Sequence, residues 1–193
     1  MEDFYTLQGE GFYAGRAAYF IRLAGCDVGC HWCDVKESWD KDAHPLVEVS
    51  DIVSKVKESG TGFAVITGGE PAMYDLTDLT TELKKNGIEI AIETSGAYLI
   101  KGNIDWICLS PKKFKLPLEE NYKKAQELKM IIFNQHDFKW AEELKQKVNK
   151  NCKLYIQPEW EKSAEMLPMM IEYVKKNTEW TLSLQTHKYL NIP

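Results

Sequence analysis

The chain has 193 residues, a formal net charge of −5, 44% hydrophobic residues and 27% charged residues. This length and composition predict a single domain, residues 1–193, with enough apolar side chains for a sizeable core. The acidic balance argues against a nucleic-acid partner, and no apolar run approaches the roughly 20 residues that cross a bilayer. The N-terminal residues lack the basic-then-apolar layout of a signal peptide, so we expect a cytoplasmic protein with no membrane partner.

Short apolar runs alternate with helical patterns along the chain. Near-continuous apolar runs of this kind are typical of parallel strands that are covered on both faces. The alternation therefore predicts an α/β fold with a mostly parallel sheet of about six strands, open or curled towards a barrel. The expected strands lie within residues 17–23, 63–67, 88–94, 105–110, 129–133, 153–157 and 180–185.

Four helical patterns with recognisable ends lie between these runs. Serine and aspartate are preferred at helix N-caps, and glycine commonly follows a helix end. A proline within a helical pattern is expected near its start or at a kink. The expected helices are one from a Ser50 cap to Gly60, one that stops near Gly87, one over 137–150 with Asp137 as its cap, and one over 163–176 that contains Pro168.

Segments rich in polar residues, glycine or proline follow the expected strands. The carboxyl ends of parallel strands share one mouth in α/β folds, and sites are built there. We therefore expect these segments to meet in one functional site. They cover residues 24–40, 68–71, 93–96, 110–113, 157–160 and 185–188.

Three of the five cysteines, Cys26, Cys30 and Cys33, follow the first expected strand with the spacing C-x3-C-x2-C. In a reducing compartment, clustered thiols indicate a metal or redox chemistry rather than a disulfide. A structural zinc ion needs four ligands, and His31 is too close to Cys30 in the chain to join the same tetrahedron easily. Three thiolates on an iron–sulfur cube would leave one iron open. The pattern favours a cluster, with zinc or unrelated thiols as the alternatives.

The cysteine spacing, together with "GGEP" at 68–71 after the second strand, resembles the radical S-adenosylmethionine (SAM) superfamily. The opening "FYTLQGEGFYAGRAAYFIRLAGC" is similar to that of 7-carboxy-7-deazaguanine synthases, and the similarity covers essentially the whole chain. The resemblance implies a shortened, incomplete (β/α) barrel. It also implies a [4Fe–4S] cluster on the three cysteines, with SAM chelating the open iron.

The reaction that this resemblance implies is that of a carbon–nitrogen lyase. It contracts 6-carboxy-5,6,7,8-tetrahydropterin to 7-carboxy-7-deazaguanine with loss of ammonia, on the route to queuosine and other deazapurines. The implied substrate-pocket residues are Leu7, Gln8, Gly9, Glu10, Arg22, Thr67, His187 and Pro193. The implied cosubstrate-binding residues are Gly68, Gly69, Glu70, Glu93, Ser95, Ser110, Pro111, Lys112, Gln157, Pro158, Glu159 and Trp160.

Some of these residues also have a physical argument of their own. An arginine inside an apolar strand suits a bound carboxylate, although Arg22 also fits an ordinary surface ion pair. The bare backbone of Gly68 and Gly69 would let a ligand approach closely, although glycines also end strands. Glu93 is suited to hydrogen bonds with the amino-pyrimidinone edge of a pterin or with the cosubstrate. The apolar C-terminal residues favour docking at the site over a frayed tail.

One position departs from the family pattern. The family typically has a threonine two residues after the third cysteine, and its hydroxyl contributes to a Mg²⁺ site. This chain has Val35 there, which offers no side-chain oxygen. Mg²⁺ prefers oxygen ligands, so the ion would depend on substrate and water or on Asp34. The sequence leaves the magnesium requirement open.

The resemblance also implies partners. These are the small-molecule pterin, an electron donor such as flavodoxin or ferredoxin, and a second copy of the chain in a homodimer. Two other functions remain compatible with the residues: a radical activase that acts on a protein, and a non-catalytic, zinc-stabilised binding module. The "LQGEG" segment and the terminal Ile-Pro favour the pterin substrate.

Overall fold

The computed structural model describes residues 1–193. Its strands form one sheet whose order equals the chain order, from β1 to β8. The first pair is antiparallel and every later pair is parallel. The strands are β1 (Glu2–Leu7), β2 (Ala17–Leu23), β3 (Phe63–Gly68), β4 (Glu89–Thr94), β5 (Trp106–Leu109), β6 (Glu127–Ile132), β7 (Lys153–Pro158) and β8 (Trp180–Leu182).

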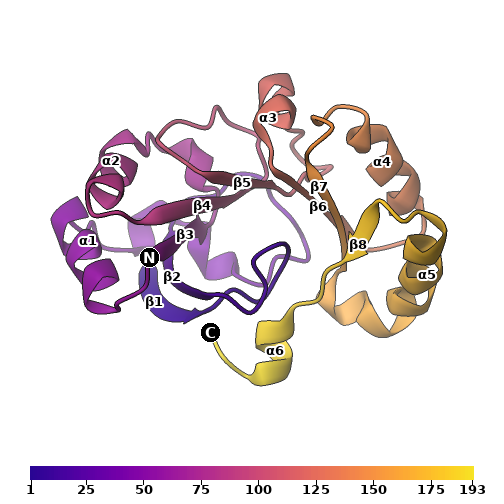
Figure 1. Ribbon diagram of the computed structural model, residues 1–193, viewed down its shortest axis with the longest axis horizontal. Helices are drawn as coiled ribbons and strands as arrows, with labels where there is room; N and C mark the ends of the chain where they lie inside the picture. The colour runs from indigo at the N-terminus through magenta and orange to yellow at the C-terminus, as the bar shows by residue number, and fades with distance from the viewer.

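The sheet curves without closing, because β1 and β8 are its two edges and do not pair with each other (Figure 1). This confirms the expected mostly parallel, incomplete barrel. The sheet has eight strands rather than about six. The unexpected strand is β1, which lies at an edge and leaves much of its length partly exposed, so its sequence has no continuous apolar run.

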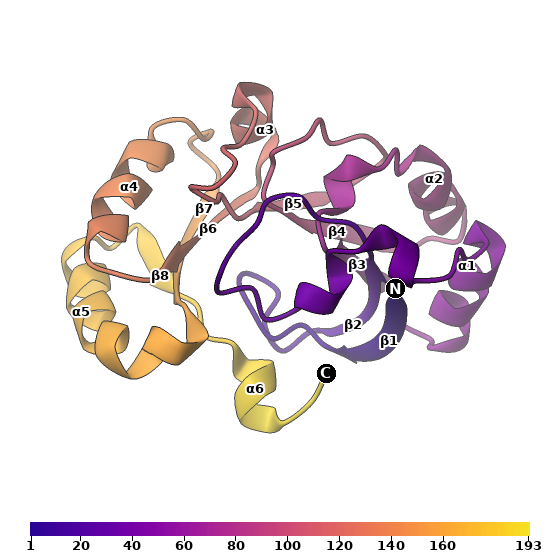
Figure 2. The same ribbon diagram turned by 180° about the vertical axis from the view of Figure 1, so that it is seen from behind.

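The first five helices lie on the outer face of the sheet, whereas the sixth lies beside the gap between β1 and β8 (Figures 1 and 2). None of them has the length and apolar character that a membrane span requires. The helices are α1 (Val49–Glu58), α2 (Thr77–Lys85), α3 (Glu119–Lys124), α4 (His136–Lys145), α5 (Ser163–Lys176) and α6 (Thr186–Leu190). Short 3-10 turns cover Lys36–Ser38, Lys41–Ala43, Pro71–Met73 and Trp160–Lys162.

Two of the expected helix caps are wrong. The first helix begins one residue before Ser50, with Glu48 as an N-cap that makes no side-chain bond. Asp137 lies inside the third expected helix, and its carboxylate accepts the backbone N–H groups of Phe133 (2.8 Å) and Asn134 (2.9 Å). Asp137 therefore stabilises the turn before α4 rather than the N-terminus of the helix itself.

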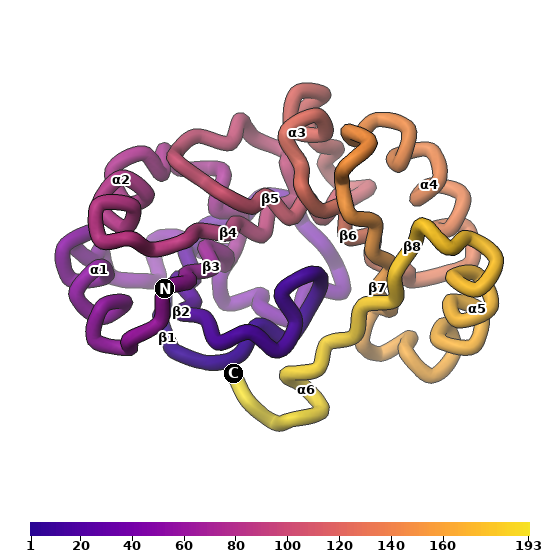
Figure 3. Tube along the Cα trace, in the orientation of Figure 1, coloured from indigo at the N-terminus to yellow at the C-terminus, as the bar shows by residue number.

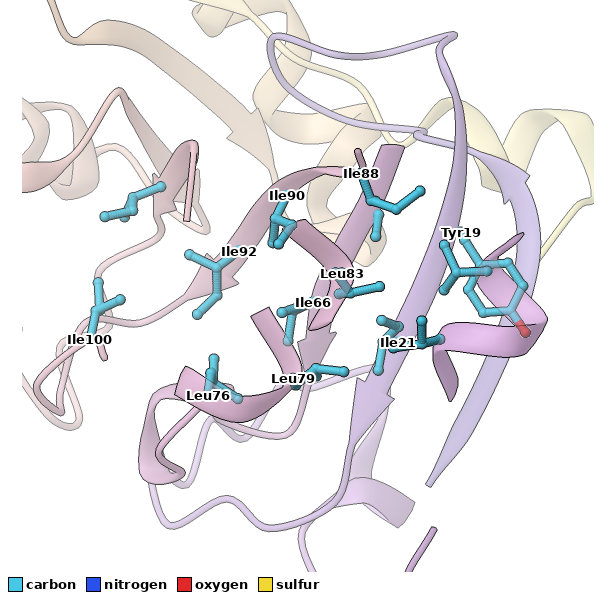
Figure 4. Packing of buried hydrophobic residues seen from close by; sticks show 14 of the residues in the cluster. Tyr19, Ile21, Ile66, Leu76, Leu79, Leu83, Ile88, Ile90, Ile92 and Ile100 are labelled. Atoms are coloured by element: carbon cyan, nitrogen blue, oxygen red, sulfur yellow. The ribbon is translucent and has the colours of Figure 1, made fainter. Parts of the chain in front are cut away.

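The apolar core has three clusters, and the two larger ones lie between the sheet and its outer helices. One of these packs α1 and α2 on β2 to β5, through residues such as Ile21, Ile66, Leu83 and Ile92 (Figure 4). The other packs α3, α4 and α5 on the later strands, with Trp180 among its buried residues. Each fully buried side chain of this size contributes roughly 1.5–3 kcal/mol, so the core fixes the strands whose ends form the site.

The loop after β1, residues 8–16, plugs the barrel at the amino ends of the strands. Phe12 stacks on Trp106 with ring centroids 4.5 Å apart, and Tyr13 packs on Phe63 at 4.8 Å. The backbone N–H of Gly11 donates to Ser183 Oγ (2.9 Å), next to β8. The loop therefore joins both halves of the sheet and closes one end of the barrel, which leaves the carboxyl ends open for a site.

Candidate active site

A cavity of about 580 Å³ lies at the carboxyl ends of the strands. It is lined by the cysteine loop, the 68–71 turn, the ends of later strands and the C-terminal segment. Every residue expected to bind substrate, cosubstrate or metal lines it except Pro111, which lines a neighbouring cavity of about 110 Å³. The segments that the sequence predicted to share one site thus line one cavity, while the individual ligand contacts stay predictions.

The three cysteines of the motif border this cavity on a loop that the backbone holds closely. Gly25 N–H donates to the Ser38 carbonyl (2.6 Å), and Cys33 N–H donates to the Cys30 carbonyl (3.0 Å). Burial raises the pKa of the Cys26 thiol, and it raises that of Cys30 to about 11 despite the nearby Lys112 ammonium. Without a metal these groups are neutral thiols at pH 7, so binding a metal releases protons.

The residues present fit a three-thiolate cluster. All five cysteines are free, and the other two do not line the cavity. No three Cys, His, Asp or Glu side chains are placed to hold one metal ion together. A cluster of several irons does not need thiolates that converge on a single ion. Three thiols on one cavity wall therefore match a cluster that keeps one position open.

The Gly68–Pro71 turn packs directly on the cysteine loop. Gly68 has φ +127°, and a Cβ on it would lie 2.0 Å from the Leu23 carbonyl oxygen. A Cβ on Gly69 would lie 2.3 Å from the Gly25 carbonyl oxygen, which also accepts the N–H of Glu70 (2.8 Å). The chain's own backbone makes a close approach at both glycines, which also line the cavity, so the close approach of a ligand stays a prediction. The glycines therefore join the two loops.

The carboxylate of Glu70 is 1% exposed and its hydrogen bonds lie within the protein. It accepts the N–H of Ala72 (3.0 Å), the hydroxyl of Thr94 (2.5 Å), and both the N–H (2.8 Å) and the hydroxyl of Ser95. Glu159 has a similar role, because its carboxylate caps the 3-10 turn at Trp160–Lys162. These residues hold the cavity wall in shape, and their contact with a cosubstrate stays a prediction.

A buried lysine that the sequence did not single out lies among the expected carboxylates. Lys129 of β6 is 3% exposed, and its Nζ lies 2.5 Å from Glu10 Oε2 and 2.7 Å from Glu93 Oε2. Burial alone would raise the pKa of Glu10, but the Lys129 ammonium holds it well below its usual range. The cavity therefore contains a compact ionic cluster from three separate segments. A lysine within the run "ELKMIIF" was the only sequence signal for it.

The C-terminal segment borders the cavity through His187, Lys188 and Pro193, and Figure 3 traces it below the sheet to the end of the chain. Its apolar residues Tyr189 and Leu190 are 60% and 58% exposed, so they do not dock it on the site as the sequence suggested.

In the same segment, Thr186 donates its N–H (2.9 Å) and its hydroxyl (2.8 Å) to the Gly9 carbonyl. Lys188 Nζ lies 2.9 Å from Asp34 Oδ2 of the cysteine loop. Burial lowers the pKa of His187, so its imidazole is neutral at pH 7. This segment therefore joins the loop after β1 to the cysteine loop.

Arg22 lines the cavity and already has an ionic partner. Its Nη1 lies 3.3 Å from Glu2 Oε1 across the β1–β2 pair, and its side chain is 22% exposed. The guanidinium also lies over the ring of Phe4, 5.3 Å from its centroid. Both sequence interpretations, a surface ion pair and a cavity residue, thus apply. Its contact with a substrate carboxylate stays a prediction.

The residues near Val35 do not fit a magnesium site. Val35 has no side-chain oxygen, and its carbonyl accepts both the N–H (3.1 Å) and the hydroxyl (2.6 Å) of Ser38. The Asp34 carboxylate is paired with the ammonium of Lys188. Mg²⁺ requires oxygen ligands in near-octahedral geometry. Neither Val35 nor Asp34 offers it an unpaired side-chain group here.

Comparisons with known proteins agree with this architecture. A model of the Radical SAM superfamily matches residues 20–153. The 7-carboxy-7-deazaguanine synthase of Flavobacterium psychrophilum is 57% identical over 196 residues, which cover 100% of this chain and 91% of that protein. The synthase of Synechocystis is 49% identical, covering 99% of this chain and 91% of that protein.

A solved structure agrees over nearly the same length. The crystal structure of QueE from Escherichia coli matches with a TM-score of 0.84 at 33% identity, covering 96% of this chain and 92% of that chain. The 7-carboxy-7-deazaguanine synthase of the same organism is 36% identical, covering 99% of this chain and 97% of that protein. This chain therefore belongs to the radical SAM superfamily and, within it, to the 7-carboxy-7-deazaguanine synthase family.

Proposed function

We propose that this chain converts 6-carboxy-5,6,7,8-tetrahydropterin to 7-carboxy-7-deazaguanine with loss of ammonia. The observation that carries the proposal is that one cavity of about 580 Å³ collects the cysteine motif, the glycine turn, the "LQGEG" segment and the C-terminus. Full-length relatives that are 36–57% identical bear the name of this synthase. The substrate differs from the product by one NH₃, so the ring contraction needs no net oxidant.

The family uses a [4Fe–4S] cluster and SAM, and Cys26, Cys30 and Cys33 would hold the cluster. When bound, the pair supplies one-electron chemistry, the reductive cleavage of SAM that starts hydrogen abstraction from the substrate. Residues 68–70, Ser110, Lys112 and 157–160, which line the cavity, would hold SAM. A cofactor carries such chemistry, while the protein controls orientation and access.

The substrate would lie between the ionic cluster and Arg22. The carboxylates of Glu10 and Glu93 accept hydrogen bonds and suit the N–H groups of the pterin ring. A guanidinium binds a carboxylate in bidentate fashion, so Arg22 would exchange the half-exposed Glu2 for the substrate carboxylate. The neutral His187 would contribute one donor or acceptor from α6. The C-terminal segment would exclude water from the reacting atoms.

The remaining requirements follow from this chemistry. The proposal includes a one-electron donor such as flavodoxin or ferredoxin, a homodimer, and a cytoplasmic location where the free thiols stay reduced. It does not include a protein-held magnesium ion, because Val35 and the paired Asp34 do not provide the ligands.

The test is an anaerobic turnover assay on reconstituted protein with SAM, dithionite and 6-carboxytetrahydropterin. Mass spectrometry would follow both 7-carboxy-7-deazaguanine and 5′-deoxyadenosine. Formation of both compounds supports the proposal. Formation of 5′-deoxyadenosine alone, from protein with a full cluster, would assign the radical chemistry to another substrate, such as the protein partner of an activase.

A further inference from the structure

Two carboxyl side chains pair with a single ammonium inside the barrel, and a third belongs to Glu127, two residues before that lysine on β6. Glu10 comes from the loop after β1 and Glu93 from the end of β4, while Glu127 and Lys129 come from β6. Figure 1 shows where these strands lie in the sheet. Lys129 and Glu127 are each 3% exposed, so neither is a surface charge. A buried lysine is costly unless its charge is paired, and here two carboxylates pair it.

The pairing is arranged so that each carboxylate uses one oxygen for Lys129 and the other for an amide. Glu10 Oε1 accepts from Gln185 Nε2 (3.0 Å), and Glu93 Oε1 accepts from Gln8 Nε2 (3.2 Å). Both carboxylates keep about a fifth of their side-chain surface exposed, at 18% and 20%, and both line the cavity. They are therefore fixed in position and still open to a ligand.

We propose that Lys129 is a positioning residue for the substrate: its buried ammonium holds Glu10 and Glu93 in fixed positions at the cavity wall, where both carboxylates receive the N–H edge of the pterin. The inference rests on the proposed function and deepens it. Lys129 lines the cavity, but its hydrogen bonds go to the two glutamates, so we assign it the role of holding them rather than that of a substrate ligand.

The charge balance of the cluster supports this assignment. Burial, and then the proximity of Glu93, raise the pKa of Glu127, whose Oε1 has no hydrogen-bond partner. Glu10 and Glu93 place two carboxylates against the single ammonium of Lys129, so this wall of the cavity carries an excess of negative charge. A ligand edge rich in N–H donors compensates this charge, whereas an edge of carbonyl or carboxylate oxygens is repelled. Arg22 on β2 suits the substrate carboxylate, so the two groups together fix one orientation.

The experiment compares Lys129→Met, which keeps the side-chain length and removes the charge, with Lys153→Met as its control. Lys153 is an exposed lysine on the adjacent strand β7 whose side chain makes no hydrogen bond or ion pair in the structure. Binding of pterin-6-carboxylate to the anaerobic cluster-loaded enzyme is measured by calorimetry, and the KM and kcat of turnover are measured separately. Iron content and SAM cleavage without substrate serve as readouts of an intact site.

We expect Lys129→Met to weaken pterin binding and raise KM at least ten-fold, with iron content and basal SAM cleavage retained. Lys129→Arg keeps the charge and should recover part of the affinity, and Lys153→Met should match the wild type. If Lys129→Met does not fold, the double variant Lys129→Met with Glu93→Gln removes one of the two carboxylate charges that the lysine pairs. It should fold and still bind pterin weakly.

The possible results separate the two proposals. Pterin affinity and KM that stay at wild-type values in Lys129→Met, or in the double variant, would overturn the positioning role of Lys129 alone. A loss of thermal stability with unchanged KM would do the same, because it indicates a purely structural ion pair. A wild-type enzyme that neither binds nor converts the pterin would overturn the proposed function and this inference together.

Discussion

Gly9 lies directly against the imidazole of His187, although the two residues are at opposite ends of the chain. A Cβ placed on Gly9 would lie 2.2 Å from His187 Nδ1 and 2.8 Å from its Cβ. The Gly9 carbonyl also accepts two hydrogen bonds from Thr186, at the start of α6. The loop after β1 and the C-terminal helix therefore form one wall of the cavity, and only a residue without a side chain fits at their contact.

We predict that Gly9→Ala moves His187 and α6 out of place without unfolding the protein. The helix lies outside all three apolar core clusters, so the loss of stability should be small, about 1 kcal/mol or less. A misplacement of about 1 Å at a site can cost on the order of 100-fold in rate, so kcat/KM should fall by at least about 10-fold. The control is Ala14→Ser, an exposed position in the same loop. Unchanged kcat/KM in Gly9→Ala would show that this wall does not position the substrate.

The corner of the cavity at Val35 gives a prediction about metal removal. Asp34 is paired with Lys188, and Val35 has no side-chain oxygen. Turnover by the cluster-loaded enzyme should therefore change less than about two-fold between excess Mg²⁺ and excess chelator, with iron content checked in both samples. Val35→Thr adds the missing hydroxyl and should bring Mg²⁺ stimulation with it. A wild-type rate that falls more than ten-fold in chelator would show that substrate and water alone hold the ion.

Glu127 gives a prediction about stability and pH. Burial raises its pKa in the folded protein above the ordinary value of 4.5. Between these two values the folded state holds more protons than the unfolded state, so the free energy of unfolding falls as pH rises through this window. Glu127→Gln removes the cost of ionising this buried group. It should raise the free energy of unfolding at pH 8 by about 1 kcal/mol, and change it little below pH 4.5.

Denaturant unfolding of both proteins in the same metal state, at pH 8 and at pH 4, measures this effect. Glu120→Gln makes the same charge change at an exposed position on α3 and should show no such pH dependence. An equal effect of Glu127→Gln at both pH values would mean that packing, rather than ionisation, controls the change.

The position of the site was predictable because its residue types are local signals. Each of these signals lies within a few residues of sequence: the cysteine spacing, the glycine turn and the polar strand ends. Parallel strands then bring their carboxyl ends together in the fold. The apolar strand runs predicted β2 to β8 for the same reason. β1 was missed because an edge strand with much exposed surface needs no apolar run. α6 was missed because five residues give too little periodicity.

The roles of single residues were less predictable because they depend on partners far away in the chain. In the sequence, Lys129 resembles a lysine that begins an apolar strand and points into solvent. Its burial became evident only in the structure, where Glu10 and Glu93 pair its charge. Asp137 has the sequence of a helix cap, but it serves the backbone of the preceding turn. Gly69 was read as room for a ligand. Gly69 lines the cavity, but the space that a Cβ would take there is filled by the backbone of the cysteine loop, and the sequence alone did not reveal this contact.

That last contact leads to a prediction about the cluster itself. A Cβ on Gly69 would lie 2.3 Å from the carbonyl oxygen and 2.7 Å from the carbonyl carbon of Gly25, and backbone atoms cannot rotate away as a side chain can. Gly69→Ala must therefore push the turn and the cysteine loop apart, next to Cys26. We expect the variant to fold, because the outer apolar core does not include this contact, but to lose most of its iron and its basal SAM cleavage.

Iron and sulfide analysis after anaerobic reconstitution measures this loss, with circular dichroism to confirm the fold. Gly62→Ala, just before the other end of β3 with open space around its Cβ, is the matched control. Full iron content in Gly69→Ala would show that the cysteine loop tolerates the shift, and that the glycine is needed for the ligand rather than for the loop.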